Sequence, residues 1–227
     1  MSSYASGSFT PAANDLLLVL VTATATVTNP GTCTSSIADI TFSPVVRSVW
    51  SSSANTVVSF VSNQFVPATS QTVTYDCTGD AATGAIVVVL RVAGMTRTGT
   101  AAIRQSAVQT NGAAAATPAP AFSGAALTGN ACVGFYGSGT SSTTKNSAPA
   151  SWTEVYDLTG FASPTTGTHV ISRNSGFTGT TVTWGGASAT VFGAQIIELD
   201  TSDPDGYSLP MQSVPSPQQQ GWPPHYT

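Results

Sequence analysis

Glu154 and Asp157 stand three residues apart in the segment SWTEVYDL. A pair of carboxylic side chains is what glycoside hydrolysis requires, one as the general acid and the other as base or nucleophile. The segment has the composition of a strand, and residues i and i+3 of a regular strand point to opposite faces. The sequence therefore predicts that this pair does not face one substrate.

Acid–base chemistry would otherwise depend on the two histidines, His169 and His225. His225 is the third residue from the end of the sequence, which is a poor position for a preorganised base. His169 begins an expected strand in TGTHVIS, where a packed or surface role is usual. The motifs G-x-S-x-G, G-x-x-x-x-G-K-[ST] and H-E-x-x-H are absent from the sequence. We expect no enzymatic activity, and we assign no catalytic, cofactor-binding or metal-binding residue.

An acidic group, DTSDPDG, places Asp200, Asp203 and Asp205 before Gly206. This spacing departs from the D-x-D-x-D-G of an EF-hand loop and lacks its distal Glu. An Asp-Pro-Asp-Gly turn accounts for the composition without a metal, so calcium stays only an alternative.

The three cysteines, Cys33, Cys77 and Cys132, leave at least one thiol unpaired. No C-x-x-C motif and no Cys/His cluster is present in the sequence. Buried free thiols are the expected state, and a Cys33–Cys77 disulfide remains an alternative.

Three tryptophans, Trp50, Trp152 and Trp184, would stack on sugar rings if they were exposed. A tryptophan in a β-sandwich more often belongs to the core. The sequence therefore leaves glycan stacking as an alternative and does not say which ring would carry it.

Composition restricts the partners. Only 7% of the residues are charged and the net charge is −4, against roughly 25% charged residues in an average soluble protein. No basic patch exists in the sequence, so we expect no nucleic-acid partner. The apolar run at 16–21 is shorter than the roughly 20 residues of a membrane span, and no basic segment precedes it as in a signal peptide. We expect no insertion into a membrane.

The elements that would position these residues are strands. Short β-branched and aromatic runs alternate with turn-forming clusters, which is typical of an antiparallel β-sandwich or jelly roll. Two runs, LLLVLV and AIVVVLRV, are apolar on successive residues and should be central strands covered on both faces. The segment 106–122 is expected to be a long loop, with a short helical turn at 101–109. Strands are expected at 16–28, 45–51, 56–65, 71–77, 85–93, 131–136, 152–157, 169–173, 180–184 and 190–199.

The two halves of this region, about 5–105 and 118–200, resemble one another. FTPAANDLLLVLV at Phe9 matches FSGAALTGNACVGF at Phe122, and the TVTYD region after Thr72 matches the TVTWG region after Thr181. Each half also has a tryptophan, Trp50 or Trp152. An internal duplication would give either one jelly roll with pseudo-twofold strand order or two packed sandwiches.

After Asp200 the chain becomes rich in Pro and Gln and has no periodic apolar pattern. We place a domain boundary there, with a β-sandwich domain at 1–200 and an extended arm at 201–227. The arm alone buries too little apolar surface to fix its own conformation. A neighbouring subunit would supply pockets, as aromatic grooves do for Pro-rich ligands. The residues expected to bind a partner in this way are Tyr207, Leu209, Met211, Val214, Trp222 and Tyr226.

The order of APASWTEVYDL, TGTHVISRNSGFTGTTVTWGG and ATVFGAQIIELD resembles a group of poorly characterised bacteriophage and prophage proteins. The first-half words FTPAANDLLLVLV, LRVAGM and IRQSAVQTN fit the same group, over residues 5–200. The resemblance implies a virion-associated β-sandwich of jelly-roll or lectin-like type, and it carries no catalytic residues. The arm lies outside it.

These observations together predict a non-enzymatic virion structural protein without a cofactor. It would be a capsid decoration, a head accessory or a tail component. Its partners would be other virion proteins and copies of itself. The alternative is a carbohydrate-binding or host-receptor-recognition module on the virion surface.

Overall fold

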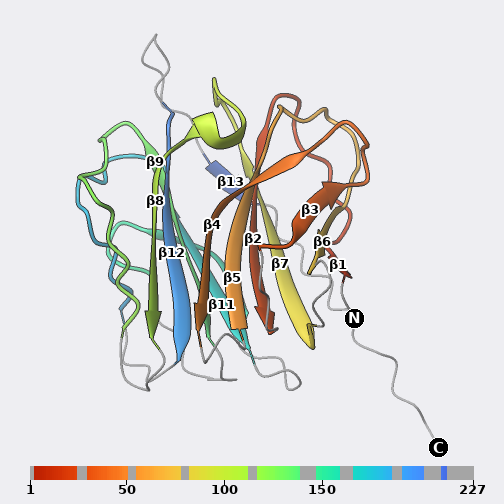
Figure 1. Cartoon of the computed structure of the whole chain (residues 1–227). Coiled ribbons are helices and arrows are strands. Elements are labelled where there is room, and N and C mark those ends of the chain that lie inside the picture. The colour runs from red at the N-terminus through yellow and green to blue at the C-terminus, as the bar shows by residue number, and fades with distance from the viewer. Residues whose placement is uncertain are drawn as a thin grey trace, which may run out of the picture.

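The computed structural model describes residues 3–24, 30–50, 55–77, 82–111, 117–138, 147–158, 166–185, 191–201 and 211–213, the last of these as backbone only. They form antiparallel sheets packed face to face, so the prediction of an all-β sandwich is confirmed (Figure 1). No helix among these residues has the length and apolar character needed to cross a bilayer.

Two five-stranded sheets make up the body of the molecule. The first-half sheet has the order β13-β7-β2-β5-β4. Its strands are β2 (Leu16–Thr24), β4 (Phe42–Trp50), β5 (Asn55–Ser62), β7 (Gly84–Val92) and β13 (Met211–Ser213). The second-half sheet has the order β10-β11-β9-β12-β8. Its strands are β8 (Ile103–Asn111), β9 (Ala131–Ser138), β10 (Thr153–Leu158), β11 (Gly167–Arg173) and β12 (Phe192–Leu199).

The outer face of each large sheet is also covered. A small sheet of β1 (Ser3–Ala5), β6 (Val73–Asp76) and β3 (Thr32–Ser35) lies over the first-half sheet. Over the second-half sheet, Val182 donates its backbone N–H to Pro120 and Trp184 donates to Pro118. Alternate residues of β2 accordingly enter two clusters, Leu18 between the large sheets and Val19 beneath the small sheet. This double coverage explains why LLLVLV is apolar on successive residues.

The sequence pattern missed one strand and predicted another that is not formed. Residues 106–122 were expected to be a loop, but β8 occupies Ile103–Asn111 and forms the edge of the second-half sheet. The helical turn expected at 101–109 is wrong from Ile103 onward, where β8 begins; the 3-10 turn η1 (Gly99–Ala102) lies just before it. The expected strand at 180–184 makes only isolated bridges, at Thr181 and Gly185.

Each half contributes four strands in the same arrangement. In chain order they are β2, β4, β5, β7 and β9, β10, β11, β12, and across the sheets they lie as β7-β2-β5-β4 and β12-β9-β11-β10. Both edge strands carry a bulge at the corresponding point, Val45 in β4 and Val155 in β10. The sandwich therefore has a pseudo-twofold strand order.

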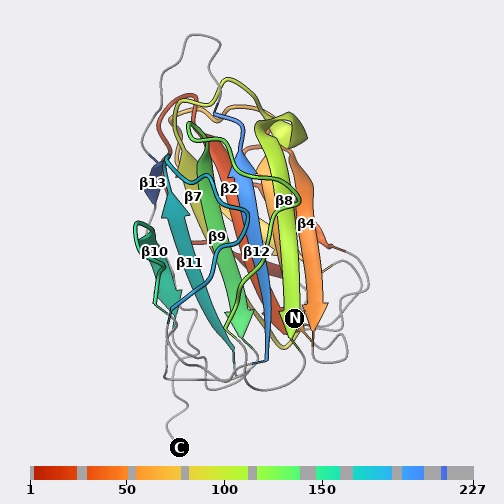
Figure 2. The same ribbon diagram turned by 90° about the vertical axis from the view of Figure 1, so that its left-hand side faces the viewer.

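The fifth strand of each sheet comes from the other half. β8 follows the first half along the chain but pairs with β12, and β13 follows the second half but pairs with β7. Figure 2 shows β8 beside β12 and β13 at the opposite side of the view. Met211–Ser213 thus returns to the sandwich, although the sequence assigned these residues to a separate arm.

The matching words in the sequence correspond to matching structure, with one exception. Phe9 donates its N–H to Gln71 O at 2.9 Å, and Phe122 donates to Thr180 O at 2.8 Å. Trp50, however, packs between the large sheets, whereas Trp152 packs on the outer face. Their pairing as equivalents is wrong, because they occupy different layers of the sandwich.

Candidate functional site: a buried histidine with two carboxylates

A bulge in β10 brings Glu154, Asp157 and His169 onto one face of the second-half sheet. Asp157 lies opposite His169 in the β10–β11 ladder, and Glu154 lies opposite Ile171. Directly opposed residues share a face, so both carboxylates lie on the face of His169. The prediction that Glu154 and Asp157 face opposite ways is wrong, because the extra residue Val155 reverses the alternation of the strand.

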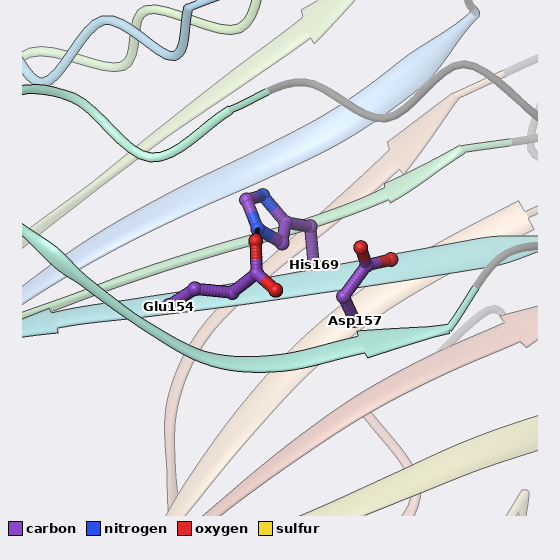
Figure 3. A group of neighbouring side chains, drawn as sticks. All are labelled: Glu154, Asp157 and His169. Carbon is purple, nitrogen blue, oxygen red and sulfur yellow. Dashed lines mark hydrogen bonds and ion pairs between the residues drawn. The ribbon is translucent and has the colours of Figure 1, made fainter.

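The three side chains converge closely (Figure 3). One ligand atom of each lies within 4.8 Å of the others, and His169 Nε2 is 3.0 Å from Glu154 Oε2. His169 is only 1% exposed, whereas the side chain of Glu154 is 50% exposed. The buried imidazole of His169 is therefore hydrogen-bonded to a carboxylate at the protein surface.

Trp184 occupies the other side of the imidazole. Its indole Nε1–H donates to His169 Nδ1 at 3.0 Å. Tyr136 packs edge-on against both rings, with centroids 5.7 Å from His169 and 5.5 Å from Trp184. Since Nδ1 accepts a hydrogen bond, the proton of the neutral imidazole lies on Nε2 and is donated to Glu154.

This tautomer opposes metal binding. Two carboxylates and one imidazole are a ligand set that zinc or iron accepts. A metal-bound histidine, however, coordinates through one nitrogen and usually donates a hydrogen bond from the other. Here the partner of Nδ1 is an N–H donor, so shifting the proton there would set two donors against each other. Glu154, Asp157 and His169 therefore fit a metal ion poorly.

The same arrangement limits acid–base chemistry. Both nitrogens of His169 are engaged, one by Trp184 and one by Glu154. A general base needs a free lone pair within reach of the proton it removes. The cluster orients Glu154 and fixes the β10 edge.

A second polar cluster surrounds Glu198, whose carboxylate is fully buried. It accepts hydrogen bonds from the Leu127 backbone N–H at 2.8 Å, from Asn130 at 2.7 Å, and from both Gln105 and Arg104 at 2.5 Å. Burial acts to raise the pKa of Glu198, but these hydrogen bonds outweigh burial and lower the pKa. The cluster joins β8 to β12 and to the turn before β9.

The first half has a counterpart built from different residues. There the Asp15 carboxylate accepts the Ala12 backbone N–H at 2.8 Å and lies 3.6 Å from Arg91 Nε. In both halves a carboxylate therefore secures the turn that leads into the central strand. Neither cluster could be recognised from the sequence, because the arginine and amide partners lie far along the chain from the carboxylates.

The three tryptophans proposed for glycan stacking are all buried. Trp50 lies between the large sheets, Trp152 contacts Phe177 with ring centroids 5.4 Å apart, and Trp184 is bonded to His169. The exposure that stacking requires is absent at these three residues, and the usual core role of tryptophan describes them.

The arm residues lie mostly outside the described part of the chain: Tyr207, Leu209, Val214, Trp222 and Tyr226, together with His225. The main chain of Met211 pairs with Val92 in the β13–β7 ladder.

Of the acidic group, Asp200 forms an ion pair with Arg97, while Asp203 and Asp205 lie outside the described residues.

The three cysteines are buried and none of them forms a disulfide, so Cys33 and Cys77 are not paired in this structure. Burial, followed by the nearby charge of Glu198, raises the pKa of Cys132 to about 12. Burial also raises the pKa of Cys33. Thiols with raised pKa values stay protonated at neutral pH, which makes them poor nucleophiles.

Comparison of the chain with protein-family models, with curated proteins and with solved structures finds no match.

Proposed function

We propose that this chain is a non-enzymatic structural protein of a bacteriophage particle, a capsid decoration or a tail component held to its neighbours through its C-terminal arm. The likeness of residues 5–200 to phage and prophage proteins suggests the particle. The fold supports a structural role within it.

The observation that carries the structural role is that charged side chains are used for contacts within the chain. Asp15 pairs with Arg91, Arg97 with Asp200, and Arg104 with Glu198. Glu154 in turn accepts a hydrogen bond from His169. Catalytic sites need groups that are poised toward a substrate, whereas these groups secure turns and strand edges. Both faces of both large sheets are also covered, which suits a rigid module.

The arm supplies the attachment. Trp222 and Tyr226 follow several prolines and glutamines, and large aromatic residues are the commonest energetic anchors of protein interfaces. The carbohydrate-binding alternative is not favoured, because Trp50, Trp152 and Trp184 are buried.

The proposal is tested in the phage or prophage that encodes the chain. Particles are purified on a density gradient and probed with antibody against the sandwich. We expect the wild-type chain in the particles, and at least tenfold less when Trp222→Ala and Tyr226→Ala are combined. Gln219→Ala with Gln220→Ala is the matched control and should be incorporated normally.

Two results would count against the proposal in different ways. Absence of the wild-type chain from purified particles would remove the virion role. Normal incorporation of the Trp222→Ala, Tyr226→Ala variant would remove the anchoring role of the arm.

A further inference from the structure

The outer edge of β7 is longer than the strand that covers it. β13 pairs with β7 only over Leu90–Val92. Among the residues that the structure describes, none pairs with Gly84–Val89 on the side away from β2. This unpaired stretch has the sequence GAIVVV, and an apolar open edge is a template for adding another strand.

The direction of the free backbone groups follows from β2. Leu17 donates its backbone N–H to Ser62 Oγ at 3.0 Å, so Leu17 faces β5. Successive residues of a strand direct their backbone groups to opposite sides, so Leu18 faces β7. The ladder partner of Leu18 is Leu90, which therefore faces β2.

By the same alternation, the backbone N–H and C=O groups of Val89 and Val87 point toward the open edge. Val89 is only 6% exposed. A buried backbone N–H or C=O without a partner costs free energy comparable to a lost hydrogen bond. A strand docked on this edge would supply partners to these groups, and their direction sets the register of such an occupant.

The repeat identifies that occupant. In the second half, the corresponding edge of β12 is covered by the full length of β8. Gln105 lies opposite Glu198 in that ladder, and Gln212 lies opposite Arg91 in the β13–β7 ladder. Both glutamines are followed by serine, Ser106 in one case and Ser213 in the other.

We propose that the open edge of β7 is the docking surface for residues 214–218 of the same chain, which continue β13 into a full strand equivalent to β8. In this register Val214 lies opposite Val89 and Ser216 opposite Val87. Only residues 219–227, with Trp222 and Tyr226, then remain free to reach a partner.

The two prolines of this segment fit the register. Val214 and Ser216 lie opposite the outward-facing Val89 and Val87, so these two residues form the hydrogen bonds to β7. The backbone nitrogens of Pro215 and Pro217 then face away from β7, on the outer side of the strand, where a missing N–H is tolerated. An outer edge with proline at alternate positions also resists the addition of a further strand.

Disulfide trapping tests the register. Opposed residues of an antiparallel pair lie within the Cα separation that a disulfide spans. We expect Val87→Cys with Ser216→Cys to form an intrachain disulfide under mild oxidation, detected by intact mass and peptide mapping. Val92→Cys with Met211→Cys, an opposed pair of the β13–β7 ladder, is the positive control. Val87→Cys with Pro217→Cys, one position out of register, should oxidise at least tenfold more slowly.

Each failure has a distinct meaning. If the 211/92 pair oxidises but the 216/87 pair does not, the strand ends at Ser213 and the proposal is overturned. A disulfide between two chains would assign the edge to a second copy and would also overturn it.

Hydrogen exchange provides a test without cysteine variants. We expect the amides of Val87 and Val89 to be protected in the full chain and to exchange at least tenfold faster in a chain ending at Ser213. Equal rates in the two chains would contradict the docking of 214–218. Neither measurement involves a phage particle, so this inference and the proposed function can fail separately.

Discussion

The hydrogen bond from Trp184 decides what His169 can do. With Nδ1 occupied by an N–H donor, the imidazole presents a proton to Glu154 and no lone pair to a cation. Glu154, Asp157 and His169 have the identities and proximity of metal ligands. The hydrogen bond from Trp184 to His169, however, is not one that a metal-bound histidine would accept.

Zinc should therefore leave the thermal stability of the protein unchanged. We expect addition of excess ZnCl2 or MnCl2 to give no rise in Tm, because a ligand that binds only the native state would stabilise it. Differential scanning fluorimetry measures this directly. A rise in Tm that disappears in Glu154→Ala would contradict the assignment of the histidine tautomer.

Glu198 should make stability depend on pH. Because its folded pKa is lowered, its contribution is complete above the unfolded pKa of about 4.3 and is lost as the pH falls through the folded value. We expect Glu198→Gln to lower the free energy of unfolding by roughly 1–3 kcal/mol at pH 7, since it weakens charge-assisted hydrogen bonds at a buried site. The difference from wild type should shrink below about pH 4.

Urea denaturation at pH 7, 5 and 3 measures this difference. Glu154→Gln is the control, because a carboxylate with a half-exposed side chain contributes only about 0–1 kcal/mol through such a contact. A difference between wild type and Glu198→Gln that stays constant with pH would count against the lowered pKa.

At the scale of elements, the two large sheets approach closely where glycines lie between them. A Cβ on Gly137 would lie 2.5 Å from Thr22 Cγ2 and 2.9 Å from Val57 Cγ1. Thr22 and Thr168 also share a hydrogen bond of 2.7 Å across the interface. The spacing of the sheets thus depends on small residues in the central strands.

Gly137→Ala should be destabilising although alanine is a small residue. We expect a loss of about 1–3 kcal/mol, the usual cost of an overpacked core. Gly129→Ala, where nothing lies within 4 Å of the added Cβ, should change stability by less than about 0.5 kcal/mol. Equal effects of the two substitutions in chemical denaturation would contradict the tight spacing at Gly137.

The sequence predicted elements well where burial left a pattern. The apolar runs of β2 and β7 were recognised because both faces of these strands are covered. β8 was missed because it is an edge strand with mixed exposure, and Asn111 begins an Asn-Gly pair typical of a loop. The candidate site was missed because Val155, the bulge residue, has no distinguishing chemistry, yet it alone determines that Glu154 and Asp157 share a face.

At the scale of the whole molecule, the halves depend on one another. The cluster between the large sheets draws on both, with Leu18 from one and Phe135 from the other. A half expressed alone would expose this apolar face and would lose the fifth strand supplied by its partner.

Fragments should therefore fold only together. We expect the fragments 1–111 and 117–227 to be insoluble or to bind the dye ANS strongly when each is expressed alone. Co-expression should give a soluble complex that copurifies through a tag on either fragment. Two independently folded fragments, each with a cooperative thermal transition, would contradict the exchange of β8.

The exchange of the fifth strands also determines what a protease can achieve. A single cleavage within residues 112–116 would leave β8 on the N-terminal piece, still hydrogen-bonded to β12 on the C-terminal piece. β13 on the C-terminal piece would remain paired with β7 on the N-terminal piece. The cut protein would stay together as a two-chain molecule, so a protein nicked between its halves would keep its shape.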